Sequence, residues 1–335
     1  MKIASACTAL LLLTSTAWAG EGTYEEFAEK RRGDCVGKPG RLDMPISIDA
    51  GGHKYRLEGH RLVQVDKDKD DRLRIAVLSA TKDDRKETLD AIDRLFAKVK
   101  KKGVDVLVVN GDLASQEINP DETLFPKLAS LGVLTIVTIG NTESCGLFNQ
   151  AATAVFQKHP NFVNGNWVRQ IELDDGVLYT LPGYYDRAFA HTGGAEKYKP
   201  KDLQVLKDMI KAGPGPKILI SHGPPKMKGK HGIDIVTDGD HVGDQQMTDL
   251  LTATKVQFGI FGHILEAGGR GSNLNGKRRV RPGKWAKQLF VNAGTANPDP
   301  WMMLNGKTGY GMALWVEVRG KKARFESFTL PEPKY

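Results

Sequence analysis

Four short, almost wholly apolar segments in this chain each end beside a polar side chain, and no other feature constrains the fold as strongly. The segments are VDVLVV, VLTIVTI, KILI and VQFGIF. Runs of this kind predict strands that are buried on both faces. The polar residues that follow them are Asp112, Asn141, His222 and His263. Because open α/β sheets bind ligands beyond the carboxyl ends of their strands, we expect these side chains to lie together.

An aspartate, an asparagine and two histidines form a mixed set of oxygen and nitrogen ligands. Such a set suits zinc, iron or manganese. Taken singly, each residue has a structural explanation, since Gly-Asp and Gly-Asn are turn dipeptides and a lone histidine is usually structural. Four residues of this kind at corresponding strand ends favour a metal site instead.

Helix signals alternate with these strands. The first helix is expected over residues 84–103, with Asp84 as its N-cap and a glycine at its end. A second is expected to begin at Asn119, with Pro120 at the first helical position, and a later one covers Gln245–Thr254. Strand, helix and strand in this order predict parallel, right-handed βαβ units, so the fold class is α/β.

The domain organisation follows from the same pattern. Residues 311–330 alternate on both sides of Arg319-Gly320, which predicts a C-terminal hairpin. No repeat or low-complexity linker divides the chain, so residues 72–335 are expected to form one domain. Residues 20–71 are expected to be an N-terminal arm and strands that pack on this domain.

The first nineteen residues predict a signal peptide. A basic Lys2, a short apolar run and the box ending at Ala19 are the parts that export requires, and the run is too short to span a membrane. An uncleaved anchor is the alternative. Cleavage near Ala19-Gly20 leaves 335 − 19 = 316 residues. We therefore expect an exported protein, periplasmic or secreted, with no transmembrane segment in the mature chain.

The cysteines bear on the same question. Cys7 leaves with the signal peptide, whereas Cys35 and Cys145 remain. Two cysteines in an oxidising compartment favour a disulfide from the N-terminal arm to the loop after Glu143. Two free thiols are the other interpretation.

The charge of the chain favours anionic partners without naming them. The net charge is +8, and it becomes +7 when the signal peptide, which contains Lys2 and no acid, is removed. Six basic residues and no acid occur in GKRRVRPGKWAK, residues Gly276–Lys287. A rim that attracts anions, a nucleic-acid patch and a solvated loop would all carry such a run. Nucleic acid is the unlikely partner for an exported protein.

An acidic run, DKDKDD from Asp66 to Asp71, has the alternation of a calcium loop. It lacks the glycine expected at the sixth position, where Asp71 stands, and the glutamate expected at the twelfth, where Val77 stands. We therefore expect a solvated turn between strands.

The motifs, taken in order, resemble those of the calcineurin-like metallophosphoesterase superfamily. That family carries Asp-x-His, Gly-Asp, Gly-Asn-His-Glu or -Asp, a lone His, and Gly-His-x-His. This chain has LSATK, NGD, GNTE, SHGPP and GHIL in the same order. It looks most similar to the branch that contains metallophosphodiesterases. The resemblance implies a four-layer αββα sandwich of two mixed sheets flanked by helices, with a two-metal site at the strand ends.

The resemblance also implies that only one of the two metal sites is complete. The ligands of one family metal match Asp112, Asn141, His222 and His263. The other metal also needs residues whose places are taken here by Ala80, Lys82 and Leu265. Thr142 stands where the family has its catalytic histidine. We therefore expect one divalent transition metal, Mn, Fe or Zn.

Three functions are compatible with this set of residues. The first is a phosphoric ester hydrolase that acts on a phosphate-ester small molecule, with weak or narrow activity because the general acid is missing. The second is a non-catalytic protein that binds a phosphorylated ligand or a protein partner. The third is a closed, structural metal site.

Two kinds of substitute for the missing groups can be considered. Lys82 could place its ammonium in the incomplete site, where it would pair with Asp112 or bind a phosphate oxygen, or it could be a solvated loop lysine. The loop histidines His191, His231 and His241 could replace the general acid, or they could be surface residues.

Overall fold

The computed structural model describes residues 20–114, 120, 122–191 and 197–332. The expected signal peptide, residues 1–19, lies outside these residues, and so does Asn119, the expected start of the second helix. Within the described ranges, every helix is too short or too polar to cross a lipid bilayer.

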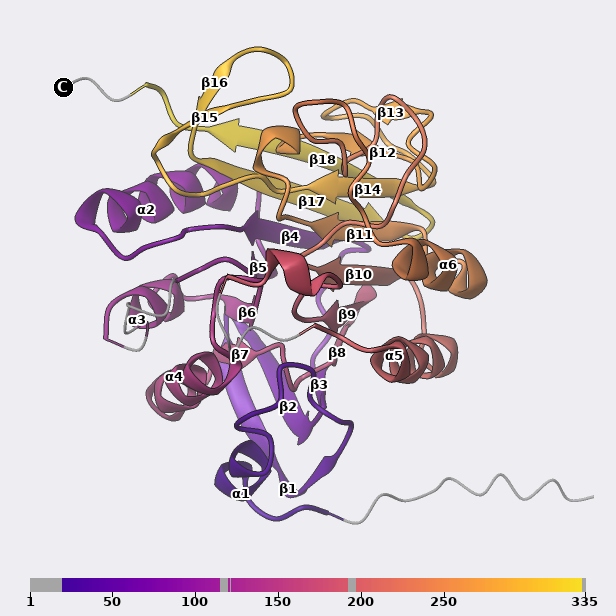
Figure 1. Cartoon of the computed structure of the whole chain (residues 1–335). Coiled ribbons are helices and arrows are strands. Elements are labelled where there is room, and N and C mark those ends of the chain that lie inside the picture. The colour runs from indigo at the N-terminus through magenta and orange to yellow at the C-terminus, as the bar shows by residue number, and fades with distance from the viewer. Residues whose placement is uncertain (1–19, 115–119, 121, 192–196, 333–335) are drawn as a thin grey trace, which may run out of the picture.

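Two mixed sheets lie face to face, with helices on both outer sides (Figure 1). The six-stranded sheet contains, in spatial order, β18 (Lys322–Thr329), β17 (Met312–Arg319), β4 (Leu73–Leu78), β5 (Val106–Asn110), β6 (Leu134–Thr138) and β7 (Phe162–Asn164). The strands β4 to β7 are parallel, whereas β17 and β18 are antiparallel. Its outer face is covered by α2 (Lys86–Lys100), α3 (Leu124–Ala129) and α4 (Cys145–Lys158).

The second sheet has ten strands. They are, in spatial order, β1 (Arg41–Ala50), β2 (His53–Gly59), β3 (Arg61–Gln64), β8 (Gln170–Leu173), β9 (Gly176–Leu181), β10 (Lys217–Ser221), β11 (Phe258–Phe261), β14 (Leu289–Asn292), β12 (Gly271–Ser272) and β13 (Arg279–Val280). The central strands β9, β10, β11 and β14 are parallel. Its outer face is covered by α5 (Pro200–Ala212) and α6 (Gln245–Thr254).

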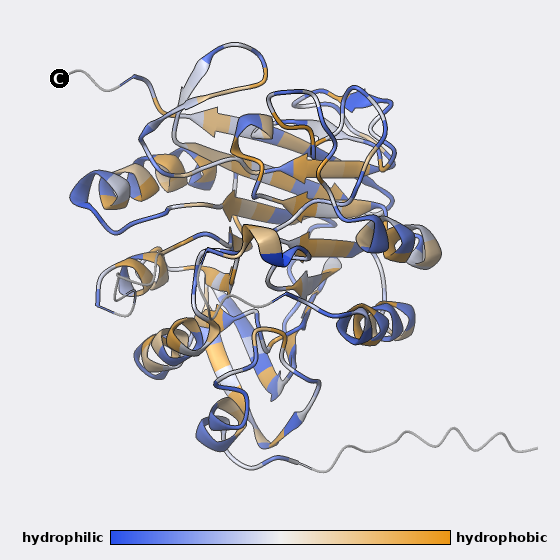
Figure 2. Cartoon of the chain, viewed as in Figure 1, coloured by the Kyte–Doolittle hydropathy of each residue, from blue (hydrophilic) through white to orange (hydrophobic). Residues whose placement is uncertain are grey.

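Three apolar cores separate these four layers. Ile75 and Val77 of β4 belong to the core between the sheets, whereas Ala76 and Leu78 belong to the core under α2 to α4. This alternation arises because successive side chains of a strand point to opposite faces. A third core lies between the ten-stranded sheet and α5 and α6. In Figure 2 the central strands are mainly orange, and the helices have blue and orange sides. The predicted four-layer αββα sandwich is confirmed.

The N-terminal segment is part of this sandwich. A short helix, α1 (Tyr24–Glu29), contributes Tyr24 and Phe27 to the core between the sheets. The strands β1 to β3 extend the ten-stranded sheet, because β3 pairs with β8 in parallel. Cys35 and Cys145 are joined by a disulfide, with their Cα atoms 5.1 Å apart. This bond links the N-terminal segment to the first residue of α4.

Two helix starts differ from the sequence prediction. The helix α2 begins at Lys86 with Arg85 at the N-cap, so Asp84 as the N-cap was wrong. The Asp84 carboxylate instead accepts a hydrogen bond from Thr123 Oγ1 at 2.6 Å, which removes it from the helix end. The helix α3 begins at Leu124, later than the expected start. The helix α6 and the C-terminal hairpin of β17 and β18 are confirmed.

A small second hairpin projects from the sandwich. It consists of β15 (Pro300–Met302) and β16 (Thr308–Tyr310), which pair only with each other. It follows the segment of Thr295 and Asn297, whose side chains hold the loop after β4. Thr295 Oγ1 donates to the Ala80 carbonyl at 2.8 Å, and Asn297 Nδ2 donates to the Thr81 carbonyl at 2.8 Å.

Candidate metal centre

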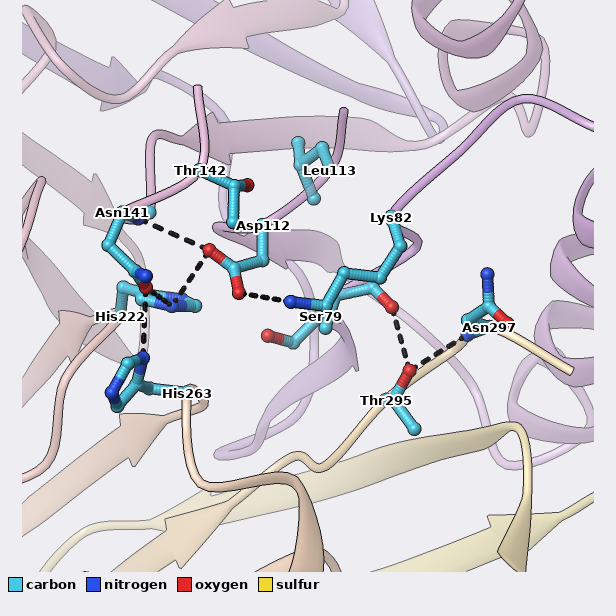
Figure 3. A network of polar contacts seen from close by, with 12 residues as sticks. Ser79, Lys82, Asp112, Leu113, Asn141, Thr142, His222, His263, Thr295 and Asn297 are labelled. Atoms are coloured by element: carbon cyan, nitrogen blue, oxygen red, sulfur yellow. Dashed lines mark hydrogen bonds and ion pairs between the residues drawn. The ribbon is translucent and has the colours of Figure 1, made fainter. Parts of the chain in front are cut away.

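The four residues predicted at strand ends come together at the seam between the two sheets. Asp112 and Asn141 follow β5 and β6 of the six-stranded sheet. His222 and His263 follow β10 and β11 of the ten-stranded sheet. Figure 3 shows the four side chains directed toward one another. Each sheet therefore contributes two side chains to the cluster.

The atoms that converge are those that could bind a metal. His222 Nε2 lies 2.9 Å from Asn141 Oδ1 and 3.1 Å from Asp112 Oδ1. His263 Nδ1 lies 2.9 Å from the same Asn141 oxygen. Ligands about 2.1 Å from an ion and at right angles around it are about 3 Å apart. The spacing of these atoms therefore resembles that of a coordination shell.

Hydrogen bonds outside the cluster fix the orientation of two of these side chains. His222 Nδ1 donates to the Asn110 carbonyl at 3.0 Å, because a carbonyl oxygen can only accept. A neutral His222 therefore presents the lone pair of Nε2 to the cluster. Asn141 Nδ2 donates to the Phe189 carbonyl at 2.8 Å, which turns Oδ1 inward. These contacts have the role of outer-shell partners in metal sites.

The chemistry of this donor set fits a cation. With Nε2 of His222 unprotonated, that nitrogen and the oxygens of Asp112 and Asn141 all present lone pairs to one another. Such groups repel unless a proton or a cation lies among them. Asp112, His222 and His263 also form a group whose ligand atoms lie within 4.8 Å of one another. Together with Asn141 they fit a divalent transition metal.

The loops around the cluster have unusual backbone conformations, and they lie very close to the side chains of the cluster. Asp112 and His263 have φ values of 57° and 64°, which are uncommon for residues other than glycine. A Cβ atom on Gly111 would lie 2.3 Å from His222 Nδ1, and one on Gly140 would lie 2.5 Å from Asp112 Oδ1. Glycine at these two positions lets the loops after β5 and β6 reach the cluster.

The electrostatics of the cluster centre on Asp112. Burial would raise the pKa of its carboxyl, but His222 and Lys82 hold that pKa well below its usual value. Burial lowers the pKa of His222, but the charge of Asp112 outweighs it, and the result is a raised pKa. Burial and the neighbouring His222 lower the pKa of His263 to about 3. Without an ion, the raised pKa of His222 favours a proton on its imidazole, which then adjoins the Asp112 carboxylate together with the Lys82 ammonium.

Glu143 organises the same loops, and the sequence did not reveal this role. Its buried carboxylate accepts hydrogen bonds from the backbone N–H groups of Leu113 and Gly140, the latter at 2.9 Å. It thus links the residue after Asp112 to the residue before Asn141. Burial and the charge of Asp112 raise the pKa of Glu143 to about 7. The only signal in the sequence was its place in the GNTE motif.

The structure also describes Lys82, Ala80 and Leu265, the residues that the resemblance assigned to the second metal. Lys82 Nζ lies 2.5 Å from Asp112 Oδ2, the carboxylate oxygen that His222 does not contact. Ala80 is fully buried, and Leu265 is buried in a short 3₁₀ turn, Leu265–Ala267. Neither has a ligand atom in its side chain. Thr142 Oγ1 donates to the Ala114 carbonyl at 3.2 Å, so its hydroxyl is bonded to backbone.

Aromatic rings and one further histidine border the cluster. The ring of Tyr184 lies 4.1 Å from that of His263, centroid to centroid, and Phe189 lies 5.9 Å from it. The backbone N–H of His191 donates to the Asn141 carbonyl at 3.0 Å. Of the three loop histidines considered above, His241 is instead paired with Asp234 at 2.9 Å.

Two further groups of side chains in the described part of the chain could hold an ion. They are His53, Asp68 and Asp105, and Asp68, Asp70 and Asp175. These residues lie around the amino ends of β4 and β5, at the edge opposite the cluster. Arg74 already pairs with Asp70 and Asp105. The arrangement agrees with a charged turn between strands.

Comparisons with known proteins identify the family. The family model "calcineurin-like phosphoesterase" matches residues 73–267, more than half of the chain. The chain belongs to the calcineurin-like phosphoesterase family. Among curated protein sequences, none matches it significantly.

Two solved structures share the fold of this member of the calcineurin-like phosphoesterase family at low identity, and a third aligns less well. One crystal structure aligns with a TM-score of 0.53 at 17% identity, over 77% of this chain and 99% of its own. The structure of TT1561 of Thermus thermophilus gives 0.50 and 15%, over 71% and 98%. A dimetal phosphatase from Danio rerio gives 0.46 and 10%, over 78% and 99%. These similarities concern the fold alone.

Proposed function

We propose that this protein is a phosphoesterase that uses one divalent transition metal, Mn, Fe or Zn, and acts on a phosphate-ester small molecule. The metal ligands are Asp112, Asn141, His222 and His263. The observation that carries the proposal is the convergence of their potential ligand atoms at 2.9–3.1 Å. A bound ion supplies a Lewis acid that polarises a phosphoryl oxygen.

Lys82 is the residue that positions the phosphate in this proposal. Its ammonium has three donor hydrogens, and the Asp112 carboxylate takes one of them. The side chain is 36% exposed, whereas that of Asp112 is 3% exposed. Lys82 therefore has donors left for a phosphate oxygen that approaches from solvent, and it supplies positive charge where the family has its second ion.

Thr142 determines which leaving groups react. Its hydroxyl donates to a backbone carbonyl and is far less acidic than the imidazolium that stands there in the family. A leaving alkoxide would therefore depart unprotonated, which costs roughly 10²–10⁴-fold in rate. We expect aryl phosphates, whose leaving groups are weaker bases, to react faster than alkyl phosphates.

A second candidate function is binding of a phosphorylated ligand without turnover. The Lys82–Asp112 ion pair supports it, because the ammonium offsets the one carboxylate among the ligands. In that case the cluster would hold a phosphate group, with a metal that is vestigial or structural. The two functions make different predictions for turnover but the same prediction for phosphate binding.

Export is part of the proposal. We infer that the mature protein begins at Gly20 and is periplasmic or secreted. The pattern of residues 1–19 supports this, and so does the Cys35–Cys145 disulfide, because such bonds persist in oxidising compartments. Amino-terminal sequencing of the protein from the extracytoplasmic fraction tests it, and an intact Met1 in that fraction would contradict it.

The experiment for the activity combines metal content with turnover. Purified mature protein is loaded with Mn, Fe or Zn, its bound metal is counted, and aryl phosphate mono- and diesters are assayed. We expect one ion per chain, and we expect His263→Ala to lose both the ion and the activity. His159→Ala, at the far end of α4, is the control and should retain both.

Three results would change the conclusion. One bound ion with no turnover of any ester would favour the binding function. Two tightly bound ions per chain would show that Ala80, Lys82 and Leu265 do not mark a missing site. A protein that takes up no ion under any condition would contradict the metal centre itself.

A further inference from the structure

A basic groove is lined by residues of β13, at the edge of the ten-stranded sheet, and of β18, at the edge of the six-stranded sheet. It has a volume of about 640 Å³. The residues that line it are Arg278, Arg279, Val280, Arg281, Lys284, Trp285, Ala286, Lys287 and Lys322. Six of these nine are cationic and none is acidic. Lys322, on β18, adds to the basic run of residues 278–287, so the groove is formed by two segments that are distant in the sequence.

Within the described part of the chain, the six cations have no acidic partner at ion-pair distance. Each ion pair found among those residues involves other lysines, arginines or histidines. Like charges that share a concave surface repel one another and raise the local positive potential. A partner with several negative charges would therefore gain energy along the whole groove.

Backbone hydrogen bonds fix the position of this run, so it differs from a freely solvated loop. Ala286 and Ala323 exchange two backbone hydrogen bonds, each of 2.8–2.9 Å. The Gly283 N–H donates to the Phe325 carbonyl at 2.8 Å, and a turn joins Lys284 N–H to the Arg281 carbonyl at 3.1 Å. The cations thus project from a backbone that is attached to β18. A partner would not have to order it first.

Trp285 adds an apolar platform among the cations. Trp285 is 40% exposed to solvent. The guanidinium of Arg324 lies 4.9 Å from its ring centroid, and Arg324 is paired with the buried Glu317 at 2.5 Å. The ring is therefore supported by an arginine whose own charge is already neutralised.

We propose that this groove binds an acidic polysaccharide, a chain of sugars that carries carboxylate or sulfate groups at regular intervals. The six cations come from residues 278–287 and from Lys322, two separate segments that line one groove, and a ligand with several anionic groups could contact both. The exposed part of Trp285 suits the apolar face of a sugar ring. Basic runs of this kind are known to bind nucleic acids and heparin-like polymers.

Two features favour a polysaccharide over other polyanions. A single-stranded nucleic acid is bound by stacking successive bases on aromatic side chains, and Trp285 is the one aromatic residue that lines the groove. A bilayer is flat and cannot enter a concave surface. A linear sugar chain needs neither several aromatic rings nor a flat face.

The test measures binding of the mature protein to a defined heparin oligosaccharide. Arg281→Gln, Lys284→Gln and Lys287→Gln are combined in one variant. Lys322→Gln, at the start of β18, is made separately and should also weaken binding. Exposed ion contacts contribute about 0.2–1 kcal/mol each, so the loss of three in the triple variant should weaken binding by roughly 3-fold to 150-fold. The salt dependence of its binding should also become shallower, because fewer counterions are displaced.

The control removes the same charge elsewhere. Lys100, Lys101 and Lys211 are exposed residues of α2, the turn after it and α5, and their triple change to Gln should leave binding unchanged. Thermal melting shows that each variant folds. Equal losses in both triple variants would overturn the proposal, because net charge alone would then explain binding. Tighter binding of a length-matched single-stranded DNA than of the oligosaccharide would overturn it as well.

Discussion

Lys82 Nζ lies 2.5 Å from Asp112 Oδ2, while the other oxygen of that carboxylate lies 3.1 Å from His222 Nε2. One carboxylate thus divides its two oxygens between an ammonium and an imidazole. Under the proposed function, the lysine would compete with a metal for the negative charge of Asp112, and it would also provide donors for a phosphate. These two effects have opposite consequences for metal and phosphate binding.

Lys82→Gln should therefore separate the two effects. Without the ammonium, Asp112 has more negative charge to offer an ion, so metal affinity should rise several-fold. Inhibition by inorganic phosphate should weaken several-fold, because a charge-assisted hydrogen bond is lost. Calorimetric titration of the metal and phosphate inhibition of aryl-phosphate turnover measure these changes. Lys86→Gln, which breaks a surface pair with Asp90 at 2.6 Å, should change neither.

The proposal that one of two metal sites is incomplete can be tested by supplying the ligands of the second. Ala80→Asp, Lys82→His and Leu265→His together should create a second metal site, and Thr142→His should then restore protonation of the leaving group. Ala80→Asp alone should do little, because one carboxylate does not complete a coordination sphere. The gain on alkyl phosphates should be non-additive and should exceed the roughly 10²–10⁴-fold of a general acid alone. A quadruple variant that binds two metals without faster turnover would favour the binding function.

Glu143→Gln should loosen the metal centre without touching a ligand. Each carboxylate oxygen accepts a hydrogen bond from one backbone N–H group. In glutamine one of these oxygens is replaced by an NH₂ group, which cannot accept, so one backbone N–H would lose its acceptor. Loss of an outer-shell contact of this kind typically reduces metal affinity by roughly 10–100-fold. Metal titration and thermal melting measure the effect. The exposed Glu87→Gln is the control, and equal affinities in both variants would contradict the role of Glu143.

The raised pKa of Asp175 predicts how the stability of the fold depends on pH. Burial and the neighbouring acids, Asp174 first, raise the pKa of its carboxyl to about 6 from the usual aspartate value of 3.8. The folded state therefore binds more protons than the unfolded state between these values, so the stability contributed by this residue falls as the pH rises through that window. Above about pH 6 Asp175 is ionised in the folded state, and its full unfavourable contribution to the free energy of unfolding is present.

Asp175→Asn should therefore stabilise the protein most above about pH 6 and least below about pH 4. One oxygen of Asp175 is buried without a hydrogen-bond partner, which agrees with a carboxyl that resists ionisation. Melting temperatures of wild type and variant across roughly pH 4–8 test this. Ser47→Ala, on the exposed face of β1, removes no titratable group and should give a difference that does not grow over the same range.

The disulfide should contribute to global stability. Cys35 and Cys145 are 110 residues apart, so the bond restricts a long loop of the unfolded chain. Replacing both by serine should lower the free energy of unfolding by about 2–4 kcal/mol. Denaturant unfolding of the variant and of the reduced wild type measures it. Two alkylatable thiols in freshly exported protein would show that the bond does not form in the cell.

The sequence predicted the ligand cluster because strand ends follow a simple rule. Apolar runs locate the strands, and parallel strands of one sheet place their carboxyl ends at one edge, so Asp112 could be placed beside Asn141. That two sheets meet and bring His222 and His263 to the same place was implied only by the family resemblance. The role of Lys82 stayed open at that stage, since a solvated lysine and a paired one look the same in sequence. Whether the side chain turns toward Asp112 depends on the left-handed backbone at Lys82, with φ of 67°.

Other features depend on contacts between distant segments and could not be read from local patterns. Glu143 acts through the backbone of Leu113, thirty residues away. Lys322 completes the basic groove because Ala286 pairs with Ala323, and no periodicity predicts that pairing. The N-cap prediction failed at Asp84 because a tertiary partner, Thr123, competes for the carboxylate.

Because the cluster is divided between the two sheets, a bound ion would also resist movement of one sheet relative to the other. Asp112 and Asn141 follow strands of one sheet, and His222 and His263 follow strands of the other. An ion coordinated by all four would therefore crosslink the two sheets. Sliding one sheet past the other would then have to break coordinate bonds as well as the apolar core. Loading the centre should accordingly slow the exchange of amide hydrogens in β5 and β10 together, although these strands belong to different sheets.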